Sequence, residues 1–172
     1  MSSPALPVGK SEILRNNSPD SSRLEIHQTA MSTIDNKNVI TTFIEDVINQ
    51  GRLERADNIV IEDFVELDPL PGQAQGREGL KAMIRQLRSA FPDIHWTVDE
   101  MLAEGDKVFT RFTWSGTHKE AFLGVPATGR RITVKGMVID RLAAGKMADS
   151  RILMDTLGMM QQLGALPVPA AK

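Results

Sequence analysis

The order of elements along this chain predicts the α+β fold class. After residue 34, apolar residues recur at three- and four-residue spacing, which is typical of amphipathic helices. After Pro92 the pattern changes to alternation of apolar and polar residues, which is typical of strands with two unlike faces. Helices followed by strands with tight turns between them favour an α+β sheet over the βαβ alternation of a parallel sheet.

Three helices are expected, and the first and the third each show one stripe of apolar residues. Gly51 ends the first helix, because glycine is favoured at a helix C-terminus. Pro92 ends the third, because proline cannot continue a helix. The expected helices span residues 35–50, 53–60 and 76–91, and a short extended segment at 64–67 lies between the second and the third.

Four strands are expected after the third helix. Ile94, Trp96 and Val98 alternate with polar residues, and Glu104 begins a tight turn that leads into the next strand. The expected strands span residues 94–98, 108–117, 132–142 and 147–155.

Composition narrows the class of protein. The 172 residues are 41% hydrophobic and 24% charged, which fits one soluble globular domain. A net charge of −2 with scattered basic residues gives no basis for nucleic-acid binding. The chain has no cysteine, which excludes disulfides and thiolate metal sites and is compatible with a cytoplasmic location. No apolar run reaches the roughly 20 residues of a membrane helix.

The two ends differ from the middle of the chain. Residues 1–33 are rich in Ser, Pro and Asn and predict a flexible leader, with an arm that packs on a partner subunit as the alternative. Residues 34–165 predict the folded domain, and residues 166–172 predict a loose tail.

The C-terminal strand and helix meet at a single carboxylate, Asp155. Met154, Leu157 and Met159 surround it in the sequence. A carboxylate desolvated by such neighbours would have a raised pKa and could exchange protons near neutral pH. The alternative is that Asp155 caps the N-terminus of the helix that follows.

Several segments in this order and spacing resemble the SnoaL-like polyketide cyclase (ester cyclase) family, within the nuclear transport factor 2-like, ketosteroid-isomerase-like superfamily. The match covers about residues 35 to 164. The segments that carry it are 90–93, 103–108, 111–118, 122–130, Arg141, 145–146, Asp155 and 163–164.

The resemblance implies a cone-shaped, curved mixed sheet wrapped by the N-terminal helices around a pocket. It implies a homodimer, no metal or organic cofactor, and Asp155 as the acid/base of an intramolecular aldol ring closure. Arg151 matches an arginine of the family pattern. Two polar pocket positions of the characterised cyclases are Gly136 and Val138 here, and Leu67 replaces a histidine that many relatives carry.

The other candidate site residues have structural alternatives. Arg151 is predicted either to orient substrate or to pair with Asp149 or Asp140. His118 is predicted either to serve as a second acid/base or to lie at the surface of the pocket rim. The three histidines are scattered, which makes a metal site improbable. The residues predicted either to line a pocket or to fill the core are Trp96, Phe112, Trp114, Met137 and Met154.

These observations predict a cofactor-independent cyclase or isomerase. Its substrate would be an apolar, carbonyl-bearing small molecule, and its mechanism acid–base catalysis at Asp155. The alternative is a module of the same fold that binds a small molecule or pairs subunits without catalysis. Epoxide hydrolysis is a third possibility, but the sequence has no clear trio of two aspartates and an arginine on convergent strands.

Overall fold

The computed structural model describes residues 32–167, so most of the predicted leader and of the tail lies outside the described residues. Helices predominate before Pro92 and strands after it, as predicted, although β1 precedes α4 and α5 follows the last strand. The elements are α2 (Thr33–Thr42), the π-helix η1 (Phe43–Asn49), the 3-10 helix η2 (Leu53–Arg55), α3 (Ala56–Ile59), β1 (Val60–Glu66), α4 (Gly76–Ala90), β2 (His95–Glu104), β3 (Lys107–Thr117), β4 (Arg131–Ala143), β5 (Lys146–Met154) and α5 (Thr156–Leu163).

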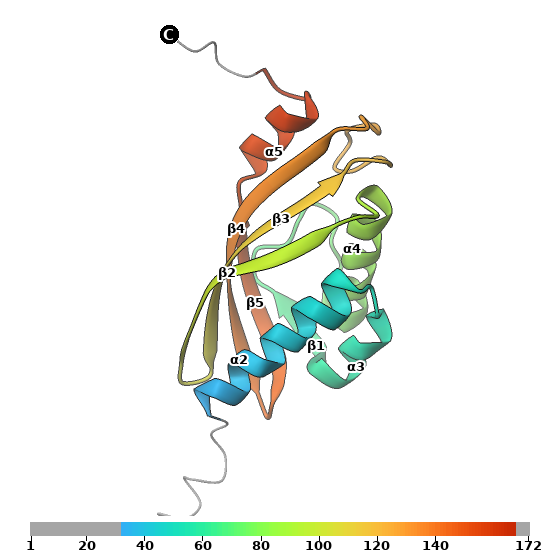
Figure 1. The fold of residues 1–172 in the computed structure, drawn as a ribbon. Helices are drawn as coiled ribbons and strands as arrows, with labels where there is room; N and C mark the ends of the chain where they lie inside the picture. The colour runs from blue at the N-terminus through green and yellow to red at the C-terminus, as the bar shows by residue number, and fades with distance from the viewer. Residues whose placement is uncertain (1–31, 168–172) are drawn as a thin grey trace, which may run out of the picture.

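The strands form one curved, unclosed sheet in the order β1-β5-β4-β3-β2 (Figure 1). The pairs β2–β3, β3–β4 and β4–β5 are antiparallel, and β1 runs parallel to β5 at the edge. This mixed sheet confirms the predicted α+β cone. The pairing with β1 joins the first strand to the last, so residues 60–66 lie beside residues 147–150.

The helices α2, α3 and α4 lie on one side of the sheet, while α5 extends beyond one end of it (Figure 1). The first helix begins at Ser32, whose side chain accepts a hydrogen bond of 3.1 Å from the Asp35 backbone N–H. It continues from α2 directly into η1 and ends before Gly51, which has a φ of 72°. The predicted stop at this glycine is therefore confirmed.

The buried core lies between the helices and the inner face of the sheet. Strand β4 shows the alternation clearly, because every second residue from Ile132 to Leu142 is buried. No helix among residues 32–167 is long and apolar enough to cross a membrane.

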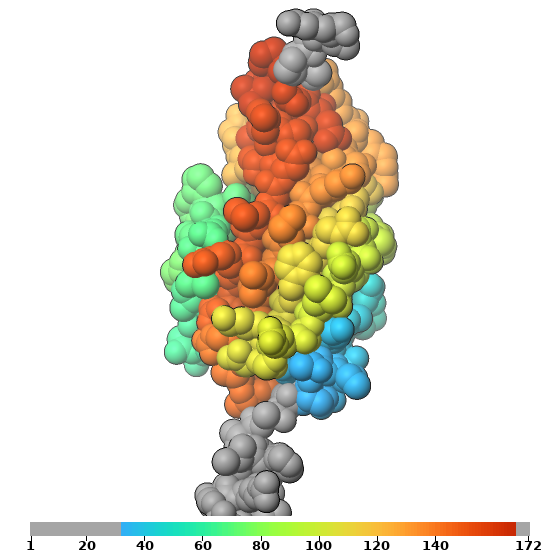
Figure 2. All heavy atoms as spheres, turned by 90° about the vertical axis from the view of Figure 1, so that its left-hand side faces the viewer, coloured from blue at the N-terminus to red at the C-terminus, as the bar shows by residue number. Residues whose placement is uncertain are grey.

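The outer face of the sheet carries no helical cover, and Figure 2 shows β2 to β5 side by side on it. Large apolar side chains are exposed on this face, with Leu153 at 65% of its full exposure. The others on this face are Leu102, Met137 and Ile139.

Candidate active site

An apolar cavity of about 120 Å³ lies between the inner face of the sheet and helices α2, η1 and α4. Its volume is below the range of roughly 300–1,000 Å³ of preformed ligand sites, so a larger ligand requires side-chain movement. Methionines supply such movement, because an unbranched thioether side chain repacks easily. Four of them line the cavity: Met83, Met147, Met154 and Met159.

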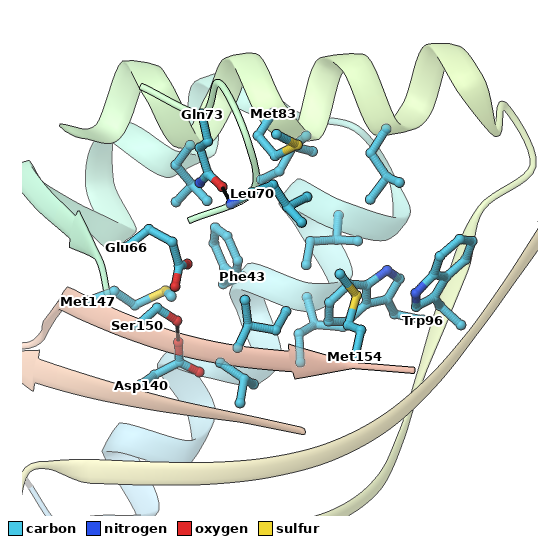
Figure 3. Close-up of a pocket in the computed structure, with 18 of the residues that line it drawn as sticks. Phe43, Glu66, Leu70, Gln73, Met83, Trp96, Asp140, Met147, Ser150 and Met154 are labelled. Carbon is cyan, nitrogen blue, oxygen red and sulfur yellow. Dashed lines mark hydrogen bonds between the residues drawn. The ribbon is translucent and has the colours of Figure 1, made fainter. Parts of the chain in front are cut away.

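One end of this cavity holds three polar side chains in a row. Glu66 on β1 pairs in register with Ser150 on β5, and Ser150 pairs with Asp140 on β4. All three side chains line the cavity and point toward one another (Figure 3). Glu66 is 7% exposed and Asp140 is 3% exposed. The Ser150 hydroxyl donates a hydrogen bond of 2.5 Å to Asp140 Oδ1.

Burial changes the acidity of both carboxyls. Desolvation raises the pKa of Glu66 from 4.5 to about 7. Desolvation likewise raises the pKa of Asp140 from 3.8 to about 7, against the lowering effect of the Ser150 hydrogen bond, and the nearby Glu66 charge raises it further. Two buried like charges resist being ionised together, so near neutral pH the pair holds about one proton.

Sequence reasoning missed this pair, although part of the signal was available. Asp140 shares the parity of Val134, Val138 and Leu142, so it lies on the apolar side of its strand. Glu66 shares the parity of buried Phe64 in the same way. A carboxylate at an inward position of a strand indicates a buried acid. From the sequence, Asp140 is predicted only as a possible ion-pair partner of Arg151.

The enclosed position predicted for Asp155 is wrong. Its side chain is exposed and lies in a shallow hollow on the outer face of the sheet, beside Asp99, Arg111 and Lys135. Asp155 is the N-cap of α5, and its Oδ1 accepts a hydrogen bond of 2.8 Å from the Gly158 N–H. The alternative of a helix cap is therefore confirmed, and the acid/base role of Asp155 stays a prediction.

The cap predicts how two substitutions at this position differ. Asp155→Ala is expected to lower the free energy of unfolding by about 1 kcal/mol, because it leaves the Gly158 N–H without its side-chain acceptor. Asp155→Asn keeps an oxygen in the same place and is expected to cost only a few tenths of a kcal/mol. Urea unfolding of both variants measures the difference; equal losses would show that the charge, rather than the hydrogen bond, matters.

Arg151 lies outside the cavity, and its contact with substrate stays a prediction. It is exposed on the outer face, as are its strand neighbours Leu153 and Asp155. Its Nε lies 3.1 Å from Asp68 Oδ2, and Asp149 pairs with Arg141 instead, so the predicted ion pairs of Arg151 with Asp149 and Asp140 are wrong.

His118 is neither at the surface nor in the cavity lining. It is fully buried, and its ring stacks on Phe91 with 5.0 Å between centroids. The Thr128 backbone N–H donates to His118 Nδ1 at 3.3 Å. Desolvation lowers the pKa of the imidazole, which favours the neutral ring. His118 is therefore part of the core rather than a rim residue.

The aromatic and Met candidates divide between the two faces of the sheet. Trp96, Trp114 and Met154 line the cavity, as predicted for pocket residues. Phe112 is in the core and stacks on Trp96 with 3.9 Å between centroids, so it supports the wall without lining it. Met137 is exposed on the outer face, where it lines the shallow hollow beside Asp155 and not the inner cavity.

The glycine at position 136 leaves room for Phe112. A Cβ atom at Gly136 would lie 2.5 Å from Phe112 Cζ and 2.9 Å from the Leu153 carbonyl oxygen. The phenyl ring therefore occupies space that any side chain at position 136 would need. Val138, the second position where the family pattern has a polar residue, is buried and lines the cavity.

This contact predicts an effect of overpacking. Gly136→Ala is expected to lower the free energy of unfolding by about 1–3 kcal/mol, because the ring or the strand must move. The double variant Gly136→Ala/Phe112→Leu is expected to lose less free energy of unfolding than the sum of the losses of the two single variants. The smaller leucine side chain relieves part of the clash with the new Cβ. Chemical denaturation of the four proteins measures this coupling, and additive losses would contradict the assigned contact.

Within residues 32–167, no three His, Asp or Glu side chains are grouped so that they could hold a metal ion. The polar groups of the cavity can instead exchange protons with a bound molecule. Glu66 and Asp140 supply titratable oxygens, and Ser150 supplies a hydroxyl.

Fold and site together define a class of protein, namely an α+β cone with an apolar internal cavity and two buried carboxyls at one end of it. A family model described as SnoaL-like polyketide cyclase matches residues 38–163, and the chain belongs to this family.

Two curated relatives are similar over most of their length. Aklanonic acid methyl ester cyclase DnrD of Streptomyces peucetius is 31% identical over 112 residues, which cover 60% of this chain and 77% of that protein. The cyclase of the same name, DauD, from Streptomyces sp. (strain C5) is 27% identical over 119 residues, covering 67% and 74%. Among solved structures, TsrD from Streptomyces laurentii has 32% identity and a TM-score of 0.73, covering 79% of this chain and 99% of that one.

Proposed function

We propose that this protein is a cyclase-type enzyme that closes a ring in an apolar, carbonyl-bearing small molecule by acid–base catalysis. The observation that carries the proposal is the pair of buried carboxyls, Glu66 and Asp140, at one end of an apolar cavity. The membership of a family whose relatives are named as cyclases supports the same reaction class.

One proton on the pair is the protonation state that an aldol-type ring closure requires. With one proton between them, one carboxylate removes a proton from a carbon next to a carbonyl, and the resulting carbon nucleophile attacks a second carbonyl of the same molecule. The other group, as the acid, donates its proton to the new alkoxide oxygen. The pair then again holds one proton. Only proton transfers are needed, so the proposal includes no cofactor.

The first substrate to test is aklanonic acid methyl ester, which the names of both curated relatives specify. We expect the wild-type protein to cyclise this ester or a related aromatic ketoester, with ring closure followed by chromatography and mass spectrometry. The double variant Glu66→Gln/Asp140→Asn is expected to bind the ester without converting it. Asp155→Asn is the control, because it removes the other candidate catalytic carboxylate. If Asp155→Asn abolishes turnover and the double variant stays active, the reaction takes place at the helix cap and the proposal is wrong. Binding without turnover by the wild type would favour a non-catalytic module.

We also propose that two copies of the chain pair through the outer face of the sheet. The exposed apolar side chains of β2, β4 and β5 support a second copy as the occupant. Charges of both signs lie on the same face, with Asp99 and Asp155 beside Arg111 and Lys135. A surface that carries both signs can be complementary to itself about a two-fold axis.

Introducing a charge on this face is expected to separate the copies. Leu153→Lys places an ammonium group among apolar side chains and should shift the sedimentation coefficient from dimer to monomer. Ile34→Lys is the matched control, because Ile34 is equally exposed at 69% but lies on α2. A wild-type protein that sediments as a monomer at micromolar concentration would contradict the proposal.

A further inference from the structure

We propose that the indole N–H groups of Trp96 and Trp114 bind a carbonyl oxygen of the ligand. This inference rests on the proposed function and narrows its substrate to a neutral, elongated, largely apolar ketone. The ketone oxygen would lie at the tryptophan end of the cavity and the reacting carbon at the carboxyl end.

The two indoles form one wall of the cavity. Trp96 on β2 and Trp114 on β3 face each other directly in the antiparallel register, and both side chains line the cavity. They are 6% and 1% exposed. Residues in such cross-strand pairs have Cβ atoms roughly 4.5–5.5 Å apart, so the two rings lie next to each other on one face of the sheet.

Within the described part of the chain, neither indole N–H has a hydrogen-bond acceptor. Both Nε1 atoms are buried, and no acceptor for them exists among residues 32–167. Buried tryptophan N–H groups usually have a partner, because an unpaired buried donor loses its hydration without compensation. The indole N–H is a donor only, so the missing partner is an acceptor such as a carbonyl oxygen.

Neighbouring contacts hold these rings in place before any ligand arrives. Trp96 stacks on Phe112 at an interplanar angle of 17°, and Trp114 packs edge-on against Phe91 with 5.2 Å between centroids. Asn49 fixes the backbone of Trp96 through two hydrogen bonds, one of 2.7 Å from the Trp96 N–H and one of 3.0 Å to the Trp96 carbonyl. The rings are therefore ordered in advance, which lowers the cost of binding. Both Nε1 atoms are closed to water, so an acceptor reaches them when flexible lining residues such as Met154 move.

The lining of the cavity selects against anions. Among the residues that line it within the described part of the chain, Glu66 and Asp140 are the charged ones, and both are acidic. A carboxylate or phosphate ligand would therefore enter without a cation to pair with and with like charges nearby. A neutral ketone or quinone oxygen accepts hydrogen bonds without this cost.

The distance between the two ends sets the shape of the ligand. Trp114 pairs with Val134 on β4, and Asp140 follows six residues later on the same face of that strand. Six residues of strand correspond to about 20 Å. Figure 3 shows Trp96 and Met154 at one side of the cavity and Glu66, Ser150 and Asp140 at the other. A molecule that reaches both ends is elongated, and the apolar residues between them favour a largely apolar molecule.

The test uses two probes of nearly the same shape, 1-tetralone and its hydrocarbon counterpart tetralin. The full chain has two tryptophans, so its 1H–15N spectrum has two indole signals and both report on this site. We expect saturation with 1-tetralone to move at least one indole proton downfield, while tetralin does not. Calorimetry is expected to show about 5- to 10-fold tighter binding of the ketone, the usual effect of one or two net hydrogen bonds.

The substitutions Trp96→Phe and Trp114→Phe each keep an aromatic ring and remove the N–H donor. In the double variant, the ratio of the affinities for 1-tetralone and tetralin is expected to be close to 1. Equal affinity of the wild type for the two probes, unmoved indole signals at saturation, or no binding of either probe would overturn the inference. The same titration with both probes on the variant Glu66→Gln/Asp140→Asn distinguishes a failure of the indole site from a failure of the proposed catalytic function. A ketone preference that persists in a protein without turnover would leave the indole site intact and refute only the catalytic role.

Discussion

Replacing Asp140 with asparagine is expected to lower turnover by about 10²- to 10⁴-fold, the usual contribution of one general acid or base. The amide has nearly the same shape as the carboxyl, and the Ser150 hydroxyl can still donate to its oxygen. The fold and the cavity are therefore expected to remain, while the titratable proton that the proposed mechanism needs at position 140 is lost. Glu66→Gln is expected to have an effect of similar size, because each carboxyl needs the other to fix the protonation state of the pair.

Kinetics can show that the two carboxyls act as a unit. The double variant is expected to be about as slow as either single variant, because residues that act together have non-additive effects. The wild-type rate is expected to follow a bell-shaped pH profile centred near 7, where one proton is on the pair. Each single variant should lose one side of the bell.

The matched control is Glu62→Gln, since Glu62 is an exposed carboxylate on the same strand as Glu66. Its turnover is expected to equal that of the wild type. If the double variant lost turnover by the product of the two single-variant factors, the two carboxyls would act independently. That result, or a turnover rate that does not depend on pH, would contradict a shared proton.

The second large effect is a loss of stability as pH rises. Both carboxyls have folded-state pKa values of about 7, raised above the values of 4.5 and 3.8 that they have when exposed. Between about pH 4 and pH 7 the folded chain therefore binds more protons than the unfolded chain, so the free energy of unfolding decreases with increasing pH. From pH 5 to pH 8 we expect a decrease on the order of 4 kcal/mol.

Asp140→Asn is expected to remove much of this decrease, because a neutral amide has no charge to desolvate. The variant should match the wild type near pH 4–5 and exceed its free energy of unfolding by about 2 kcal/mol at pH 8. Urea unfolding at fixed ionic strength measures both curves. Asp106→Asn, at an exposed position in the β2–β3 turn, is the control and should follow the wild-type curve. Wild-type stability that stays level or increases from pH 5 to pH 8 would contradict the burial of both carboxyls.

Local patterns in the sequence were sufficient to predict the elements and the fold class. The stripe from Val39 to Ile48 and the alternation around Trp96 depend on residues a few positions apart, which share a face once the period is known. Gly51 and Pro92 marked helix ends for local reasons as well. The family followed from the order and spacing of short segments, which the match over residues 38–163 confirms.

The tertiary structure decided which carboxylate is buried. Successive residues of a strand point to opposite faces, so an error of one position in choosing the inner face reverses every assignment. On β5 the inner face is that of Ser150, Ile152 and Met154, which leaves Arg151 and Asp155 outside. The row of Glu66, Ser150 and Asp140 depends on β1 pairing in parallel with β5, a contact between segments more than 80 positions apart. Sequence periodicity carries no information about such a pairing, because it arises only when the chain closes its sheet around a common core.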